Sequence, residues 1–142
     1  AGIGTLLALG LGDTVRVSLT ADPVSEVQTA KSILQSMHAR SFGPEIISCP
    51  TCGRTQVDLI PIAENVAEGL KGIDAPIKVA VMGCPVNGPG EAKEADIGVA
   101  CGREAGILFS RGKVIKKVAP GEIVNALLQL AKAYVEHPEG VN

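Results

Sequence analysis

Residues 76–84, Pro-Ile-Lys-Val-Ala-Val-Met-Gly-Cys, combine a predicted β-strand with a cysteine at its end. Ile77, Val79 and Val81 alternate with their neighbours, which predicts a β-strand over residues 76–82 with one apolar face. The strand leads directly into Cys84 and a loop, residues 83–90, that holds three glycines and two prolines. Such a loop lets backbone N–H groups approach a sulfide or an anion closely, although its composition alone also fits a plain tight turn.

Predicted strands and helices alternate along the rest of the chain. Further strands are expected over residues 14–20, 45–48 and 95–100, and a hairpin over 107–109 and 113–118. Helices are expected from Asp22-Pro23 to about residue 39, from a capping box at Thr55 to Asp58 through about Gly72, and from residue 120 or 121 to before Pro138. The pattern predicts an α/β fold with α+β-like features, in which helices pack on a mixed β-sheet.

Length, charge and composition exclude several classes of protein. The chain has 142 residues, a net charge of −2 and three aromatic side chains, which argues against nucleic-acid binding. Residues 1–12 are apolar but too short to span a bilayer, and no signal peptide is recognisable, so we expect a cytoplasmic protein without a membrane partner. The chain does not begin with Met, and residues 2–11 resemble a packed element. We therefore expect a part of a longer protein.

Four cysteines, Cys49, Cys52, Cys84 and Cys101, are the clearest candidates for chemistry. The spacing of Cys49 and Cys52, between a predicted strand and a predicted helix, suits a redox dithiol, a zinc site or an iron–sulfur cluster. A dithiol needs no third cysteine, and zinc usually takes two such pairs, whereas Cys84 and Cys101 stand 17 residues apart. The spacing therefore favours a cluster modestly over zinc, and unligated thiols remain an alternative.

The spacing of the residues does not identify the fourth ligand of such a cluster. Cys101 is the default for a site with four thiolates and follows a predicted strand. Glu91, at the end of the glycine-rich loop, would be a harder and more weakly held ligand that leaves one iron exchangeable. Residue chemistry alone does not decide between these two.

Three motifs carry a resemblance to a known family. Residues 49–55 (CPTCGRT), 78–84 (KVAVMGC) and 86–91 (VNGPGE) resemble the 4-hydroxy-3-methylbut-2-enyl diphosphate synthases of the non-mevalonate isoprenoid pathway. Residues 12–20 and the helix start at 22–27 are similar to this family too, so the resemblance covers essentially the whole chain. It implies that residues 1–40 are the last strand and helix of an otherwise missing (β/α)8 barrel, and that residues 41–142 form a C-terminal [4Fe–4S] domain.

The resemblance also implies residue roles. Cys101 becomes a small buried residue without a ligand role, and Pro85 departs from the family pattern, which has an apolar β-branched residue beside the cysteine. Arg16 and Ser18 would hold the substrate's diphosphate at the end of a barrel strand. The remaining implied roles are cluster ligation by Cys49, Cys52, Cys84 and Glu91, and contact with the substrate by Asn87, with Glu91 and Asn87 as the catalytic residues.

The implied reaction is a two-electron reductive dehydration that opens the ring of 2-C-methyl-D-erythritol 2,4-cyclodiphosphate. Flavodoxin or ferredoxin would supply the electrons, and the full-length enzyme would be a homodimer. This chain alone is expected to carry the cluster without turning over, because it lacks most of the barrel that positions the diphosphate. The alternative of a different class is a zinc-stabilised interaction module without catalytic activity.

Overall fold

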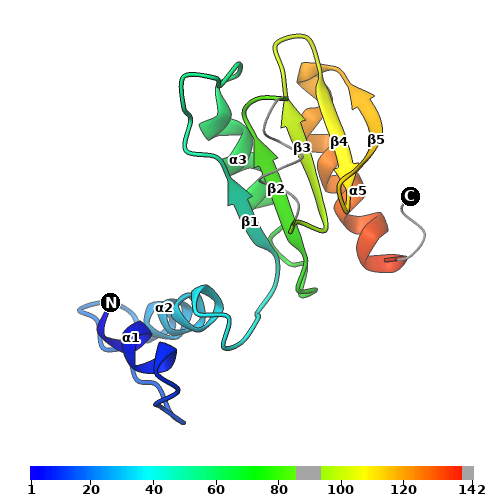
Figure 1. The fold of residues 1–142 in the computed structure, drawn as a ribbon. Helices are drawn as coiled ribbons and strands as arrows, with labels where there is room; N and C mark the ends of the chain where they lie inside the picture. Colours follow the sequence, from blue (N-terminus) through cyan, green and yellow to red (C-terminus); the bar gives the residue numbers. More distant parts are fainter. Residues whose placement is uncertain (86–93, 139–142) are drawn as a thin grey trace. The chain divides into compact units, whose positions relative to one another are not determined.

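The computed structural model describes residues 1–85 and 94–138 (Figure 1). The chain divides into two compact units, Ala1–Phe42 and Gly43–Asn142.

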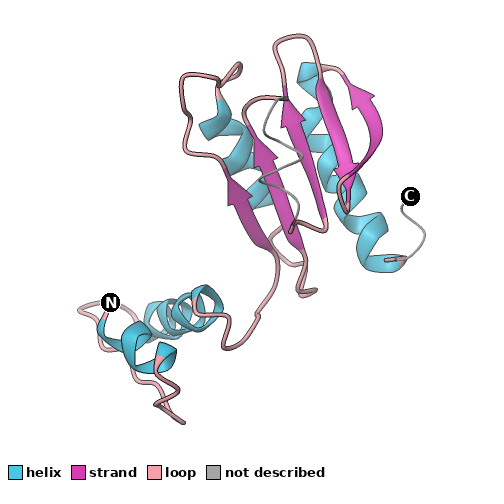
Figure 2. Cartoon of the chain, in the orientation of Figure 1, coloured by secondary structure: helices cyan, strands magenta, loops and turns pink. Residues whose placement is uncertain are grey.

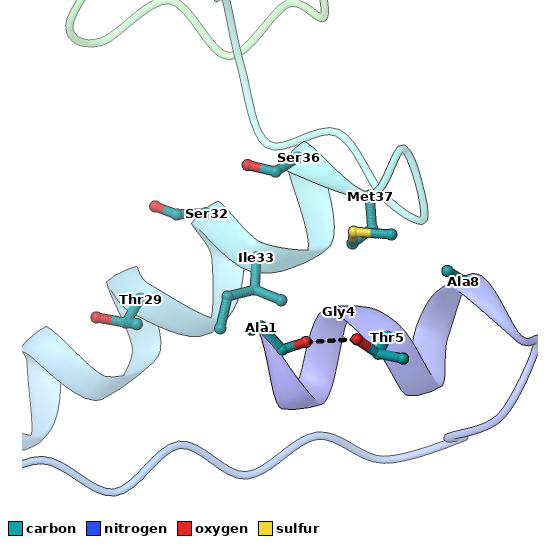
Figure 3. A pocket seen from close by; sticks show the side chains of 9 residues that line it. All are labelled: Ala1, Gly4, Thr5, Ala8, Thr29, Ser32, Ile33, Ser36 and Met37. Atoms are coloured by element: carbon teal, nitrogen blue, oxygen red, sulfur yellow. Dashed lines mark hydrogen bonds between the residues drawn. The ribbon is translucent and has the colours of Figure 1, made fainter.

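The first unit consists of helix α1 (Gly2–Ala8), helix α2 (Pro23–Ser36) and the segment between them. Helix α2 begins where the Asp22-Pro23 pair predicts, because the Asp22 side chain accepts a hydrogen bond of 2.8 Å from the backbone N–H of Val24. The two helices approach closely at Gly4, where an added methyl group would lie 3.2 Å from the sulfur of Met37. An open pocket, lined mainly by small and hydroxyl side chains, lies between them (Figure 3).

The strand expected over residues 14–20 is absent. These residues are not paired in a sheet, and no described residue of the first unit belongs to a β-strand. Alternating apolar residues favour an extended backbone, but a strand exists only where a neighbour supplies the ladder of hydrogen bonds. Val15 and Val17 are half-buried in this unit, while Arg16 and Ser18 are exposed.

The second unit contains a five-stranded mixed sheet, as expected (Figure 2). Its strands follow the order β1-β2-β3-β4-β5. Strands β1, β2 and β3 are parallel, and β4 is antiparallel to both of its neighbours, β3 and β5. The hairpin turns at Arg111 and Gly112, whose positive φ angles of 48° and 78° fit a tight primed turn. The strands span Glu45–Ser48, Lys78–Met82, Ile97–Cys101, Gly106–Ser110 and Lys113–Val118.

Helices α3 (Leu59–Gly69) and α5 (Ile123–Glu136) cover one face of the sheet, and the short 3-10 helix η1 (Pro120–Glu122) leads into α5 (Figure 1). The predicted apolar face of residues 76–82 is confirmed, because Ile77, Val79 and Val81 all belong to the core beneath these helices. Cores of this kind supply most of the free energy of folding. The residues of these helices buried in this core, together with the C-cap of α3 at Leu70, are Leu59, Val66, Leu70, Ile123, Leu127, Ala131 and Tyr134.

The start of helix α3 differs from the prediction. The helix begins at Leu59 with Asp58 as its N-cap, and no side-chain hydrogen bond caps it. The predicted capping box at Thr55 is wrong because residues 55 and 56 form other hydrogen bonds. The backbone N–H of Thr55 donates to the carbonyl of Cys52, and that of Gln56 donates to the carbonyl of Gly83.

At the amino ends of β2 and β3, Asp96 is the centre of a polar network. Its carboxylate accepts hydrogen bonds from the Tyr134 hydroxyl (3.0 Å) and the Lys78 backbone N–H (2.8 Å). Arg111 donates two bonds to the Tyr134 oxygen, and the Asp96 carbonyl accepts from the Arg111 backbone N–H and the Ser110 hydroxyl. The network therefore joins β2, β3, the β4–β5 turn and α5 at one end of the sheet.

Strands β1 and β5 form the two edges of the sheet. Strand β1 is four residues long. Strand β5 presents exposed Lys113, Lys116 and Lys117, and its pairing with β4 shifts register between Leu108 and Phe109, as at a β-bulge. No helix within residues 1–85 and 94–138 has the length and apolar character needed to cross a membrane.

Candidate metal centre

Three of the four cysteines lie where parallel strands end. Cys49 directly follows β1, Cys84 follows β2 after one residue, and Cys101 is the last residue of β3. Because β1, β2 and β3 are parallel neighbours, these positions share the carboxyl edge of the sheet. Ligand sites in open α/β sheets lie at this edge.

Cys49 and the residue before Cys84 are in direct contact. The backbone N–H of Gly83 donates a hydrogen bond of 3.3 Å to the Sγ atom of Cys49. Backbone N–H groups that donate to sulfur help to set the electronic properties of metal-bound thiolates. Cys49 is half-buried and Cys84 is buried, so this part of the edge is largely shielded from water.

Cys52 lies on the turn that links β1 to helix α3. Thr51, the residue before it, has a φ of 47°, which is an unusual left-handed conformation for a β-branched residue. Cys52 is exposed, and hydrogen bonds from the backbone and side chain of Arg54 lower the pKa of its thiol. A lowered pKa favours the thiolate, which is the form that binds metals.

Gln56 connects three loops at this edge. Its backbone N–H donates to the carbonyl of Gly83, and its side-chain oxygen accepts from the backbone N–H of Arg103 at 3.4 Å. The turn after Cys52, the loop of Cys84 and the β3–β4 turn are thereby joined. Sequence reasoning missed Gln56, since nothing in the local pattern distinguishes it from a surface residue.

Cys101 differs chemically from the other three. Its side chain is fully buried in the core under the helices, and burial, with a smaller effect of nearby Cys49, raises the pKa of its thiol to about 11. A raised pKa disfavours the thiolate, which is the form that binds metals.

Thr55 and Gly83 are two further residues of the site. Both lie within the sequence motifs, but the sequence analysis gave neither of them a role in binding a metal. A methyl group added to Gly83 would lie 2.8 Å from Cγ2 and 3.3 Å from Oγ1 of Thr55, and 3.4 Å from Sγ of Cys49. Only glycine fits between these side chains without displacing them. The Thr55 hydroxyl is buried and has no hydrogen-bond partner within the described part of the chain.

The other expected site residues are not joined to these cysteines. Asn87 and Glu91 lie outside the described residues, and Arg16 and Ser18 belong to the first unit. Within residues 1–85 and 94–138, no three Cys, His, Asp or Glu side chains are grouped closely enough to hold a metal ion. The structure thus brings Cys49 and Cys84 to one edge, with Cys52 on the adjoining turn.

The residues at this edge fit an iron–sulfur cluster in their chemistry. Thiolates are its usual ligands, and here two cysteines follow parallel strands while a third has a lowered pKa. The Gly83 N–H already donates to one of these sulfur atoms, and the Thr55 hydroxyl is a buried donor without an acceptor among the described residues. Both donors suit the sulfur-rich surface of a cluster.

The fold and site define this protein as an α/β domain with a candidate metal centre at the carboxyl edge of a mixed sheet. Residues 45–133, more than half of the chain, match the model of the GcpE protein C-terminal domain, and residues 1–31 match the GcpE TIM-barrel domain. The chain therefore belongs to the GcpE family. The resemblance seen in the sequence and the expected order of a barrel part followed by a C-terminal domain are both confirmed.

Curated relatives agree with this assignment. Proteins from Dehalococcoides mccartyi and Aquifex aeolicus are each 59% identical over 128 residues, which is 90% of this chain. A Clostridium perfringens protein is 57% identical over 129 residues, or 91% of the chain. All three are named 4-hydroxy-3-methylbut-2-en-1-yl diphosphate synthase (flavodoxin). The chain spans 36–37% of the length of these relatives. None of their names supports the alternative of a zinc-stabilised interaction module.

Proposed function

We propose that this chain is the C-terminal, cluster-binding part of an enzyme that reductively opens 2-C-methyl-D-erythritol 2,4-cyclodiphosphate to 4-hydroxy-3-methylbut-2-enyl diphosphate. The observation that carries the proposal is the contact between Gly83 and Cys49 at the edge where Cys84 also lies. The names of the relatives support the reaction. Because those names include flavodoxin, they favour flavodoxin over ferredoxin as the electron donor.

The cofactor we propose is a [4Fe–4S] cluster held by Cys49, Cys52 and Cys84, with Glu91 as the fourth ligand. A cluster bound here supplies single electrons and an iron atom that acts as a Lewis acid. The lowered pKa of Cys52 and the buried setting of Cys84 favour ligation. Burial in the core and the raised pKa of Cys101 make it a weaker candidate than Glu91 for the fourth position.

The remaining residues would bind and orient the substrate. Arg16 and Ser18 are proposed to hold the diphosphate, because a guanidinium and a hydroxyl both donate hydrogen bonds to phosphate oxygens. Asn87 is proposed to face the substrate beside Glu91, and these two would be the catalytic residues. We propose residues 1–40 as the barrel part and 41–142 as the cluster domain of a cytoplasmic enzyme that is a homodimer at full length.

Anaerobic reconstitution with iron and sulfide tests the cofactor. The chain should bind about four irons and absorb broadly in the visible range, whereas one zinc and a colourless protein would contradict the proposal. Glu91→Ala should give a cluster that loses one iron readily, and Cys101→Ala should keep all four. The reverse result would move the fourth ligand to Cys101. We expect no conversion of the cyclic diphosphate by this chain alone, even with a reductant.

A further inference from the structure

The hydroxyl of Thr55 is a buried polar group for which the described residues supply no hydrogen-bond partner. Its oxygen is shielded from solvent and has no hydrogen-bond partner among residues 1–85 and 94–138. Leaving a buried hydroxyl without a partner costs free energy, so an acceptor is expected when the site is complete. Threonine oxygens in other positions of this chain, such as Thr29, readily find a backbone carbonyl.

The geometry around Gly83 indicates what that acceptor is. The Thr55 oxygen and the Cys49 sulfur lie 3.3 and 3.4 Å from the same point, where a side chain on Gly83 would begin. Both atoms therefore line the same small space beside Gly83. The Gly83 N–H already donates to this sulfur, so sulfur is the acceptor chemistry present there.

We propose that the Thr55 hydroxyl donates a hydrogen bond to a sulfur atom of the cluster at Cys49 and thereby raises the reduction potential of the cluster. This inference rests on the proposed cofactor. Reduction adds negative charge to the sulfur atoms, and a donated hydrogen bond stabilises that charge. The acceptor is either a sulfide next to Cys49 or the Cys49 thiolate itself, whose sulfur is not a hydrogen-bond partner of this hydroxyl before a cluster binds.

Two substitutions of Thr55 separate this role from a packing role. Thr55→Val keeps the shape and removes the donor, whereas Thr55→Ser keeps the donor and removes the methyl group. In the metal-free chain, Thr55→Val should unfold at a higher denaturant concentration than the wild type, because it removes a buried hydroxyl without a partner. A hydroxyl bonded within the protein would give the opposite result and overturn the inference.

The decisive measurement is the reduction potential of the reconstituted cluster, titrated anaerobically with dithionite and followed by electron paramagnetic resonance. Thr55→Val should disfavour the reduced state by about tenfold, which corresponds to a potential about 59 mV lower for one electron. Thr55→Ser should restore most of that shift. An unchanged potential in a fully loaded Thr55→Val cluster would overturn the inference and leave the proposed function intact.

Two further readouts complete the test. Resonance Raman spectra in H2O and D2O should show an exchange shift that Thr55→Val abolishes, in terminal Fe–S(Cys) modes for a bond to Cys49 or in bridging modes for a bond to sulfide. A spectrum insensitive to both exchange and substitution contradicts the hydrogen bond. Failure of the wild-type chain to bind iron would instead overturn the proposed function, and this inference with it.

Discussion

The two ends of the sheet differ in how completely their polar groups are hydrogen-bonded. At the amino ends of β2 and β3, every oxygen of Asp96 accepts a hydrogen bond, and the left-handed Arg111 is held by the same network. At the carboxyl ends, Thr51 is left-handed and the buried Thr55 hydroxyl has no described partner. One end therefore stabilises the fold, while the described part of the other end holds a strained residue and one unpaired buried donor, as is typical of ligand sites.

The largest expected effect comes from removing the network at the amino ends. Asp96→Ala should lower the free energy of unfolding by about 3 kcal/mol, because it leaves the Lys78 N–H and the Tyr134 hydroxyl without their charged acceptor. Denaturant titration of the metal-free chain measures this. Asp74→Ala, at an exposed position, is the control and should change it by less than about 0.5 kcal/mol. A loss of similar size in the control would show that Asp96 has no special role.

A methyl group at Gly83 should disrupt the carboxyl end through a steric clash. Gly83→Ala places a carbon 2.8 Å from Cγ2 of Thr55 and should cost about 2 kcal/mol of stability in the metal-free chain. Combining it with Thr55→Ser, which removes that carbon, should recover part of the loss. Gly121→Ala, which would meet no atom within 4 Å, is the matched control. A double variant no more stable than Gly83→Ala would place the clash elsewhere.

Relieving the strain at Thr51 should have a smaller and favourable effect. Thr51→Asn should raise the free energy of unfolding by about 1 kcal/mol, because asparagine tolerates a positive φ better than a β-branched residue does. Thermal or chemical unfolding of the metal-free chain checks this, with Thr20→Asn, which has no positive φ, as the control. Lower stability in Thr51→Asn would mean that the threonine side chain contributes more than the strain costs.

The last expected effect, about as large as that at Thr51, is a pH dependence from Cys101. The folded thiol has a pKa of about 11 against an ordinary value of 9.0, so between these values the unfolded chain releases its proton more readily. The stability linked to this protonated thiol is fully present below pH 9 and is lost as the pH rises towards 11. Unfolding at pH 8 and pH 10 should therefore show a steeper loss in the wild type than in Cys101→Ala. Equal losses would contradict the burial argument.

The core residues, which depend on hydrophobic periodicity, were predicted correctly from the sequence. The features that depend on contacts with distant segments were predicted wrongly. The alternation of Ile77, Val79 and Val81 and the apolar stripes of α3 and α5 were sufficient to place the core. The strand over residues 14–20 was wrong, since periodicity cannot report whether a neighbouring strand is present. The start of α3 was wrong because distant Gly83 binds the backbone at Gln56.

The cluster and its ligands stay predictions, whereas part of the arrangement of the cysteines can be compared with the structure. Chain order places Cys49 and Cys84 after strands, and parallel pairing then brings them to one edge, which a sequence reader can anticipate. The choice of Glu91 over Cys101 came from the resemblance and stays a prediction, to which the structure adds only that Cys101 is buried in the core. Gln56 and the donor role proposed for Thr55 depend on contacts between residues far apart in the chain, and no local pattern encodes them.

The edges of the sheet bear on how the chain behaves at high concentration. Unpaired strand edges are templates on which another chain can build a β-ladder. Strand β1 offers only four residues, while β5 combines three exposed lysines with a shift of register. Short length, repelling charge and an irregular ladder each oppose intermolecular strand addition. The sheet is thereby protected from growing into aggregates during the cluster reconstitution that tests the proposed function.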